Sequence, residues 1–293
     1  MLAAMTTKKR SLGRRLLLWV GLFLALLVGA GWLAVVLLSK PLPKGESGAR
    51  ADELARGIEK AIDKEAWART GAIKWTFRGQ NRHLWDRQRN FDRVIMGENY
   101  VLCDLNKKTG VAFAKRKRVG AAMERKLLDK AYASWINDSF WLNPLVKLFD
   151  EGVTRSVVTL AADKPEGQVN GQAAGASALL ITYGGGGLTP GDSYLWVLPQ
   201  GSGAGGAEAA LGRPLAWRMW VSIIPVKGLE TSWDGWTQLA TGAWVATRHQ
   251  LSGTGVKLDL TDVAGAATLK DLLPGPDPFA MLVGGGDLEL APE

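Results

Sequence analysis

Cysteine and histidine, which carry much of the metal and redox chemistry of proteins, are nearly missing from this sequence. Cys103 is the only cysteine, and the two histidines, His83 and His249, lie far apart. One cysteine excludes an internal disulfide and a cysteine metal site, and no H-E-x-x-H or similar pair is present. We therefore expect no metal and no cofactor, and we expect each histidine to face solvent on a strand or to be a satisfied core residue.

Motifs for catalysis are also lacking. Ser177 lies in Gly-Ala-Ser-Ala, without the second glycine of a nucleophile elbow, and the glycine run 184–187 is not followed by the Lys-Ser/Thr of a phosphate loop. The carboxylates beside apolar segments are scattered, without the spacing of an acid–base pair: Asp138, Asp150, Glu151, Glu230 and Asp234. The protein is therefore not expected to be an enzyme.

An excess of positive charge that would indicate nucleic-acid binding is absent from most of the chain. The net charge is +8, but five cations precede residue 16, so the rest of the chain carries only +3. A basic stretch at 107–130 has few aromatic residues to stack on bases. Its central cations are expected on a solvated hairpin or helix, or against an anionic membrane surface or a partner. They are Lys115, Arg116, Lys117 and Arg118.

A long apolar run is what the sequence does have. Residues 16–38 contain neither a charge nor a proline, and as a helix they would be about 34 Å long, enough to cross a bilayer. The run is too long for a signal peptide and lacks a small-x-small cleavage site, so it predicts an uncleaved signal anchor. No cysteine follows it, which excludes N-terminal lipidation.

The cations before the run set the orientation. By the positive-inside rule, residues 1–15 form a cytoplasmic tail and the domain lies in the periplasm, held by a single pass through the inner membrane. Gly21, Ala25 and Gly29 make a small-xxx-small face, which is compatible with a weak dimer.

After a linker at 39–50, the pattern predicts a mainly β domain at 51–263 of α+β class. Apolar residues at helical spacing predict an amphipathic helix at 51–67. A second helix is expected at 124–135, broken by the segment 135–144 that ends in Pro144. Low-complexity residues 199–214 predict a hairpin tip, and residues 264–293 form a C-terminal extension.

Alternation with a period of two predicts the strands, which are short and separated by polar turns, as in an antiparallel meander. No strand–helix–strand alternation indicates a parallel sheet. The expected strands are 73–77, 83–87, 91–96, 100–104, 111–115, 155–159, 178–183, 193–198, 215–224, 230–236, 244–251 and 256–263.

Tryptophan is frequent, with 13 residues, of which only Trp19 and Trp32 lie in the apolar run. The rest either fill a core or line a wide apolar cavity. Alternate residues of the segments 73–77 and 215–224 would line such a cavity, and the segment 135–144 supplies a lid or plug. The cavity candidates are Ile73, Trp75, Phe77, Trp217, Met219, Val221 and Ile223, and the plug candidates are Phe140 and Trp141.

The order of strands and the placement of aromatics resemble the periplasmic lipoprotein-carrier superfamily, the bacterial lipoprotein localisation factors. The matching segments are the helix before Ile-Lys-Trp-Thr-Phe at 73–77, Ser-Tyr-Leu-Trp-Val-Leu at 193–198, Gly-Arg-Pro-Leu-Ala-Trp at 212–217, Trp-Asp-Gly-Trp at 233–236 and Gly-Ala-Trp-Val-Ala-Thr-Arg at 242–248. The resemblance implies an incomplete antiparallel barrel of about eleven strands whose concave face is covered by helices. The family's members diffuse freely, whereas this chain is expected to be anchored.

Two functions follow as expectations. The first is a membrane-tethered protein that binds lipid or lipoprotein acyl chains in an apolar cavity, for transport, sensing or scaffolding. The second is a non-catalytic structural or interaction domain of the cell envelope with a filled core, which would contact a partner through the basic stretch. The volume of the interior decides between them.

Overall fold

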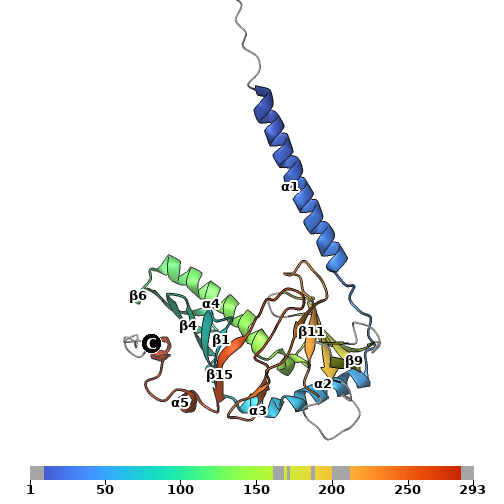
Figure 1. Cartoon of the computed structure of the whole chain (residues 1–293). Helices are drawn as coiled ribbons and strands as arrows, with labels where there is room; N and C mark the ends of the chain where they lie inside the picture. The colour runs from blue at the N-terminus through green and yellow to red at the C-terminus, as the bar shows by residue number, and fades with distance from the viewer. Residues whose placement is uncertain (1–9, 161–167, 170–171, 186–188, 200–211, 285–293) are drawn as a thin grey trace, which may run out of the picture.

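The computed structural model describes residues 10–160, 168–169, 172–185, 189–199 and 212–284. Figure 1 shows one long helix that projects from a folded body made of strands and shorter helices. Several predicted segments lie wholly or partly outside the described residues: the tail 1–15, the glycine run 184–187, the hairpin tip 199–214 and the extension 264–293.

The projecting helix is α1 (Arg10–Leu38). Within it, Leu16–Leu38 is the one segment of the described chain that is long and apolar enough to cross a membrane. Its side chains are exposed except for the half-buried Val35, so this helix adds nothing to the core. By length and composition it qualifies as a membrane anchor or as a signal sequence.

The first sheet is an antiparallel meander with the last described strand added at its edge. β3 and β4 are joined by two residues, of which Gly97 has a φ of 60°, as a tight hairpin turn requires. In order across the sheet its seven strands are β15 (Leu260–Ala266), β1 (Ala72–Phe77), β2 (Asn81–Asp86), β3 (Phe91–Met96), β4 (Asn99–Asp104), β5 (Thr109–Ala114) and β6 (Lys117–Arg118).

The second sheet is antiparallel as well, and β8 (Gln168–Val169) pairs with one of its strands, β9. A short ribbon, β13 (Thr237–Gln238) with β14 (Trp244–Val245), lies outside both sheets. The five strands of the main path are β12 (Leu229–Ser232), β11 (Ala216–Trp220), β10 (Ser193–Pro199), β9 (Gln172–Tyr183) and β7 (Val153–Thr159). The α+β class and the antiparallel pairing are confirmed, but the described strands form two open sheets instead of one curved sheet.

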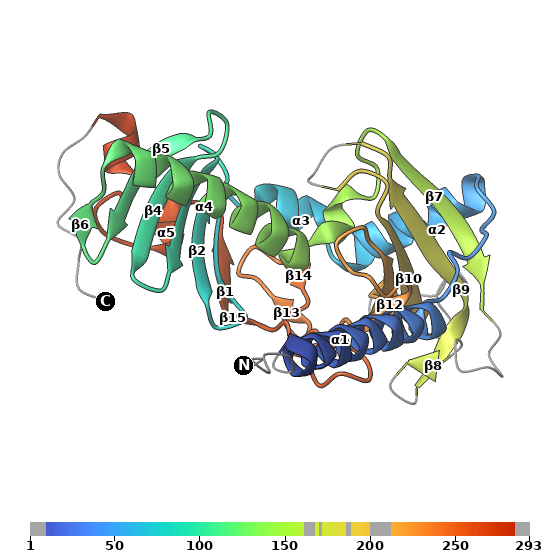
Figure 2. The ribbon, with the colours of Figure 1, turned by 90° about the horizontal axis from the view of Figure 1, so that it is seen from above.

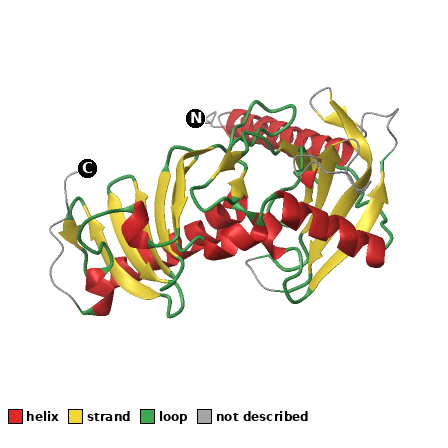
Figure 3. Cartoon of the chain, turned by 90° about the horizontal axis from the view of Figure 1, so that it is seen from below, coloured by secondary structure: helices red, strands yellow, loops and turns green. Residues whose placement is uncertain are grey.

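Helices connect and cover the two sheets (Figures 2 and 3). α4 (Ala121–Leu142) crosses the first sheet and ends between the two, while α2 (Ala49–Ala61) lies against the second. The remaining helical elements are α3 (Lys64–Arg69), α5 (Leu269–Leu272) and the 3-10 helices η1 (Pro144–Lys147) and η4 (Ala280–Val283). The largest apolar cluster takes residues from both sheets, from α2 and from the end of α4, and so forms the centre of the body.

Two predicted helices are wrong at their ends. The helix expected at 51–67 is divided at Asp63, which has a φ of 52° and whose Oδ1 accepts the Ala66 N–H at 2.9 Å, so that it caps α3. The break expected at 135–144 does not occur, because α4 continues to Leu142. Proline restricts mainly the residue before it, and only Asn143 is non-helical, with φ −159° and ψ 75°.

The strand expected at 215–224 is also too long. β11 ends at Trp220 and a turn follows, because Gly228 N–H donates to the Met219 carbonyl at 2.7 Å and closes the hairpin to β12. Pro225, which has no N–H to give to a ladder, lies within this turn. In the turn, Lys227 Nζ donates to the carbonyls of Val221 at 2.5 Å and Ile224 at 2.9 Å. The strands expected at 230–236, 244–251 and 256–263 are likewise shorter or shifted, as β12, β14 and β15 show.

The expected linker at 39–50 is hydrogen-bonded to the folded body. Lys40 N–H donates to the Lys227 carbonyl at 2.9 Å, directly after α1 ends. Further on, Glu46 and Val157 of β7 exchange two backbone hydrogen bonds, at 2.8 and 2.9 Å, as an isolated antiparallel bridge. The segment between α1 and α2 is therefore attached to the second sheet at two places.

Candidate functional site

The predicted cavity wall lies in the central core. Trp75 of β1, Trp196 of β10, Trp217 of β11 and Trp233 after β12 are at most 1% exposed. Indole rings cover a large area for little rotamer entropy, and the antiparallel pairing of β10 with β11 puts Trp196 directly opposite Trp217. Around Trp217 the ring-centroid distances are 4.6 Å to Trp233, 4.8 Å to Trp141 and 4.9 Å to Trp196. These rings interlock with one another.

The plug candidates lie against this wall. Phe140 and Trp141 directly precede Leu142, the last residue of α4, and both contact Trp217, with ring-centroid distances of 5.9 and 4.8 Å. Phe140 also contacts Tyr194 at 5.3 Å, and Trp141 contacts Phe77 of the first sheet at 6.4 Å. The end of α4 thus fills the space between the two sheets.

Six of the seven cavity candidates share one cluster: Ile73, Trp75, Phe77, Trp217, Met219 and Val221. The placement of Ile223 with them was wrong. Its side chain is 72% exposed, because β11 stops three residues earlier and the alternation of faces stops with it.

Several polar groups in this core have no partner. Among the described residues, the buried indole N–H groups of Trp75, Trp196 and Trp217 find no acceptor, and the buried Tyr183 hydroxyl finds no partner. A buried donor without an acceptor costs roughly 1–3 kcal/mol. The aromatic core is therefore packed with apolar rings but also contains buried hydrogen-bond donors that lack acceptors.

A buried charged triad is the feature that the sequence reasoning missed. His83 of β2 lies between two carboxylates, with Nδ1 3.0 Å from Asp92 Oδ2 and Nε2 3.0 Å from Asp138 Oδ2. The three side chains are at most 2% exposed. Asn81 donates to Asp138 at 2.8 Å, and the Trp75 ring stacks on the imidazole at 4.5 Å. Because Asp92 is on β3 and Asp138 on α4, the triad fastens α4 to the first sheet.

The two histidines have opposite electrostatics. Burial lowers the pKa of His83, but the charge of Asp92 and the hydrogen bonds to Asp138 and Asp92 outweigh it and raise the pKa to about 9. Burial against Trp233, with ring centroids 4.0 Å apart, lowers the pKa of His249 to about 3. His83 is therefore cationic and His249 neutral near pH 7.

This difference predicts that histidine titration gives a stability maximum near pH 6.5. Above the unfolded value of 6.5 and up to about 9, only folded His83 keeps its proton, so stability falls as pH rises. Between 6.5 and about 3, only unfolded His249 takes up a proton, so stability falls as pH falls. Urea unfolding across pH measures both limbs. His83→Gln should flatten the alkaline limb alone, and His249→Phe the limb just below pH 6.5; unchanged limbs would contradict the assignment.

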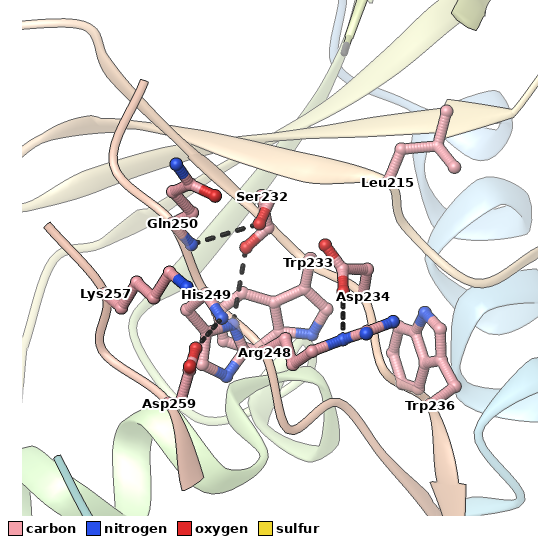
Figure 4. A pocket seen from close by; sticks show the side chains of 10 residues that line it. All are labelled: Leu215, Ser232, Trp233, Asp234, Trp236, Arg248, His249, Gln250, Lys257 and Asp259. Atoms are coloured by element: carbon pink, nitrogen blue, oxygen red, sulfur yellow. Dashed lines mark hydrogen bonds and ion pairs between the residues drawn. The ribbon is translucent and has the colours of Figure 1, made fainter. Parts of the chain in front are cut away.

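A polar pocket of about 530 Å³ lies beside the core (Figure 4). Arg248 pairs with Asp234 at 2.8 Å, and Asp259 Oδ1 accepts the backbone N–H of His249 at 3.1 Å. His249 itself is 0% exposed and cannot meet a substrate in this conformation. The lining residues are Leu215, Ser232, Trp233, Asp234, Trp236, Arg248, His249, Gln250, Lys257 and Asp259.

The four predicted surface cations lie where β5 turns into β6, and all four are exposed. Lys115 is 3.7 Å from Glu98, and Arg118 is 3.7 Å from Glu124. These are loose, solvent-screened pairs, so the turn keeps a positive surface. Among the described residues, no group of three or more His, Cys, Asp or Glu side chains could hold a metal ion.

No protein-family model matches the chain, and no curated protein is similar to it at a significant level. Two solved structures are distantly similar, each at 10% sequence identity. One is a Vibrio parahaemolyticus domain assigned to outer membrane lipoprotein sorting, with a TM-score of 0.32, covering 79% of this chain and 98% of that one. The other is a DUF1329 family protein from Desulfovibrio piger, with a TM-score of 0.35, covering 74% and 94%. Both TM-scores are below 0.5, so neither similarity enters the functional argument.

Proposed function

We propose that this chain is a membrane-tethered, non-catalytic domain of the cell envelope, which acts by contacts at its surface. The observation that carries the proposal is the interlocked core. The space that a guest would need holds the packed rings of Trp141, Trp196, Trp217 and Trp233. In this proposal α1 is the tether, which its length and apolar composition support, and the cations before residue 16 support a periplasmic domain by the positive-inside rule.

The absence of catalysis is part of this proposal and is supported by the state of the titratable groups. His83 is held on both nitrogens by carboxylates, and all three side chains are buried. Such a histidine has no free nitrogen to give or take a proton during a reaction. His249 is neutral and lies inside the aromatic core.

A second candidate function, binding of an acyl chain, is favoured by one observation. In the described part of the chain, the buried N–H groups of Trp75, Trp196 and Trp217 lack acceptors, and a lipid with ester carbonyls could supply them. For this, Phe140 and Trp141 would have to leave the space between the sheets. Exposing these two rings to water costs free energy. Burial of the acyl chain, at about 0.8 kcal/mol for each methylene, has to exceed that cost.

Lipid content separates the two candidates. Residues 39–293, without the exposed helix α1, should fold alone because α1 contributes no core residue. We expect this domain, purified without detergent, to carry no stoichiometric lipid by mass spectrometry of organic extracts. A fluorescent fatty acid should also fail to bind, because the core is full.

A pair of variants sharpens this test. Trp141→Ala opens space at the plug, whereas Met123→Ala changes an exposed residue at the other end of α4. Under the first proposal, the fatty acid binds only to Trp141→Ala. The acyl-chain function would be supported instead if the unaltered chain carried one lipid per molecule. Both variants would then also retain lipid through purification, and the fluorescent fatty acid would displace it.

A further inference from the structure

The turn between β11 and β12, residues 221–228, is fastened to the end of α1. Trp220 Nε1 donates to the Lys40 carbonyl at 2.8 Å, and Lys40 N–H donates to the Lys227 carbonyl at 2.9 Å. Lys227 N–H in turn donates to Ser39 Oγ at 3.0 Å. Ser39 and Lys40 are the first residues after the apolar segment Leu16–Leu38, so the turn is bonded to the helix exit.

The turn itself is held rigidly. Lys227 Nζ binds the carbonyls of Val221 and Ile224, and the Ser222 N–H donates to Asp192 Oδ1 at 2.7 Å. Gly228 closes the hairpin with a φ of 73°, and a Cβ there would be 2.8 Å from the Lys40 Cβ. The turn and the chain leaving α1 therefore form one packed unit.

An isoleucine projects from this unit. Ile223 is 72% exposed, more than any other large apolar residue of the described chain outside α1. A single exposed apolar residue is ordinary on a protein surface. This one is only four residues from Lys227, at most about 14 Å along the chain, and its neighbours Ser222 and Pro225 are exposed as well.

We infer that the turn 221–228 is a second membrane contact, in which Ile223 inserts into the lipid interface beside α1. The inference rests on the proposed tether: if Leu16–Leu38 crosses the hydrocarbon, Ser39 and Lys40 lie at its surface, and residues bonded to them lie in the headgroup layer. The half-exposed Trp220 indole beside Lys40 suits this layer. The exposed Lys40 and Lys44 would attract anionic headgroups.

The consequence is a fixed orientation of the domain relative to the membrane. One attachment would leave the domain free to swivel about the helix exit, whereas two define which side faces the lipid. In Figure 1, the N-terminal end of α4 points to the side on which α1 leaves the body.

The test uses the full chain in vesicles of phosphatidylcholine and phosphatidylglycerol, with an environment-sensitive fluorophore on one introduced thiol. The positions are Ile223→Cys, Val28→Cys in the middle of α1, and Val283→Cys as a matched exposed apolar residue on η4. Burial, with Asp92 and Asp104, raises the pKa of the native Cys103 to about 12, so the unaltered chain should remain unlabelled.

Quenching by lipids with a nitroxide on the acyl chain gives the result. We expect quenching at position 223 and at position 28, and none at position 283. Quenching at 28 alone would overturn the second contact and leave the tether intact. Absence of quenching at 28 would overturn the tether and the inference together. A label at 223 that is blue-shifted but not quenched would show that it is buried against protein, in the same chain or a second copy, and would also overturn the second contact.

Discussion

Replacing His83 with glutamine is expected to destabilise the domain by about 3–5 kcal/mol, since removing one partner of a buried ion pair leaves uncompensated charge. In this protein the buried carboxyl groups of Asp92 and Asp138 would be left without the imidazolium between them, and Asp92, whose pKa burial raises, would lose the charge that favours its ionised form. Urea unfolding of residues 39–293 at pH 6.5, where the imidazolium contributes fully, measures the free energy of unfolding.

The control for His83→Gln is Lys74→Gln on the neighbouring strand β1. Lys74 is exposed, and a surface substitution is expected to change the free energy by about 0.5 kcal/mol or less. Adding Asp92→Asn and Asp138→Asn to His83→Gln should restore part of the loss, because the unpaired charges are then gone. If Asp92→Asn and Asp138→Asn instead lower the free energy of unfolding further, His83 stabilises the domain by filling volume and not by its charge.

Truncating Trp217 to alanine should have an effect of similar size, about 3–5 kcal/mol, from lost burial and the cavity that remains. Trp217 is 1% exposed and has ring contacts with Phe140, Trp141, Tyr194, Trp196 and Trp233. The measurement is again urea unfolding of the isolated domain. Ile223→Ala, six residues further along the chain and exposed, serves as the control.

The size of the Trp217→Ala loss also bears on function. A filled core cannot relax around a missing indole, so the full loss is expected. A loss below about 1 kcal/mol would mean that the surrounding rings are loosely held. In that case the acyl-chain candidate would gain support over the filled-core proposal.

The strands of the first sheet could be predicted from the sequence because their signal is local. The alternation on 73–77 corresponds to β1, and the strand expected at 91–96 has the same bounds as β3. The second sheet is less well predicted. On 215–224 the face made by alternate residues stays apolar from Leu215 to Ile223, so periodicity could not indicate where the strand ends.

The site was predicted in part for the same reason. Strand alternation placed six cavity candidates on one side, where the structure brings them together, but it cannot tell whether facing rings interlock or leave a space. The triad depends on three distant segments. Its one local signal is that Asp138 falls at helical spacing with the buried Leu127, Ala131, Trp141 and Leu142 of α4, a face on which an aspartate requires a partner.

The attachments of the segment after α1 limit how far the folded body can move from the end of this helix. Residues 39–48, if free, could extend about 35 Å and let the body explore the space above the bilayer. Both ends of this stretch are instead clamped, at Lys227 and at Val157. These two attachments hold the body close to the C-terminal end of α1. If α1 is the membrane anchor proposed above, a molecule that binds the body must reach it at the membrane surface.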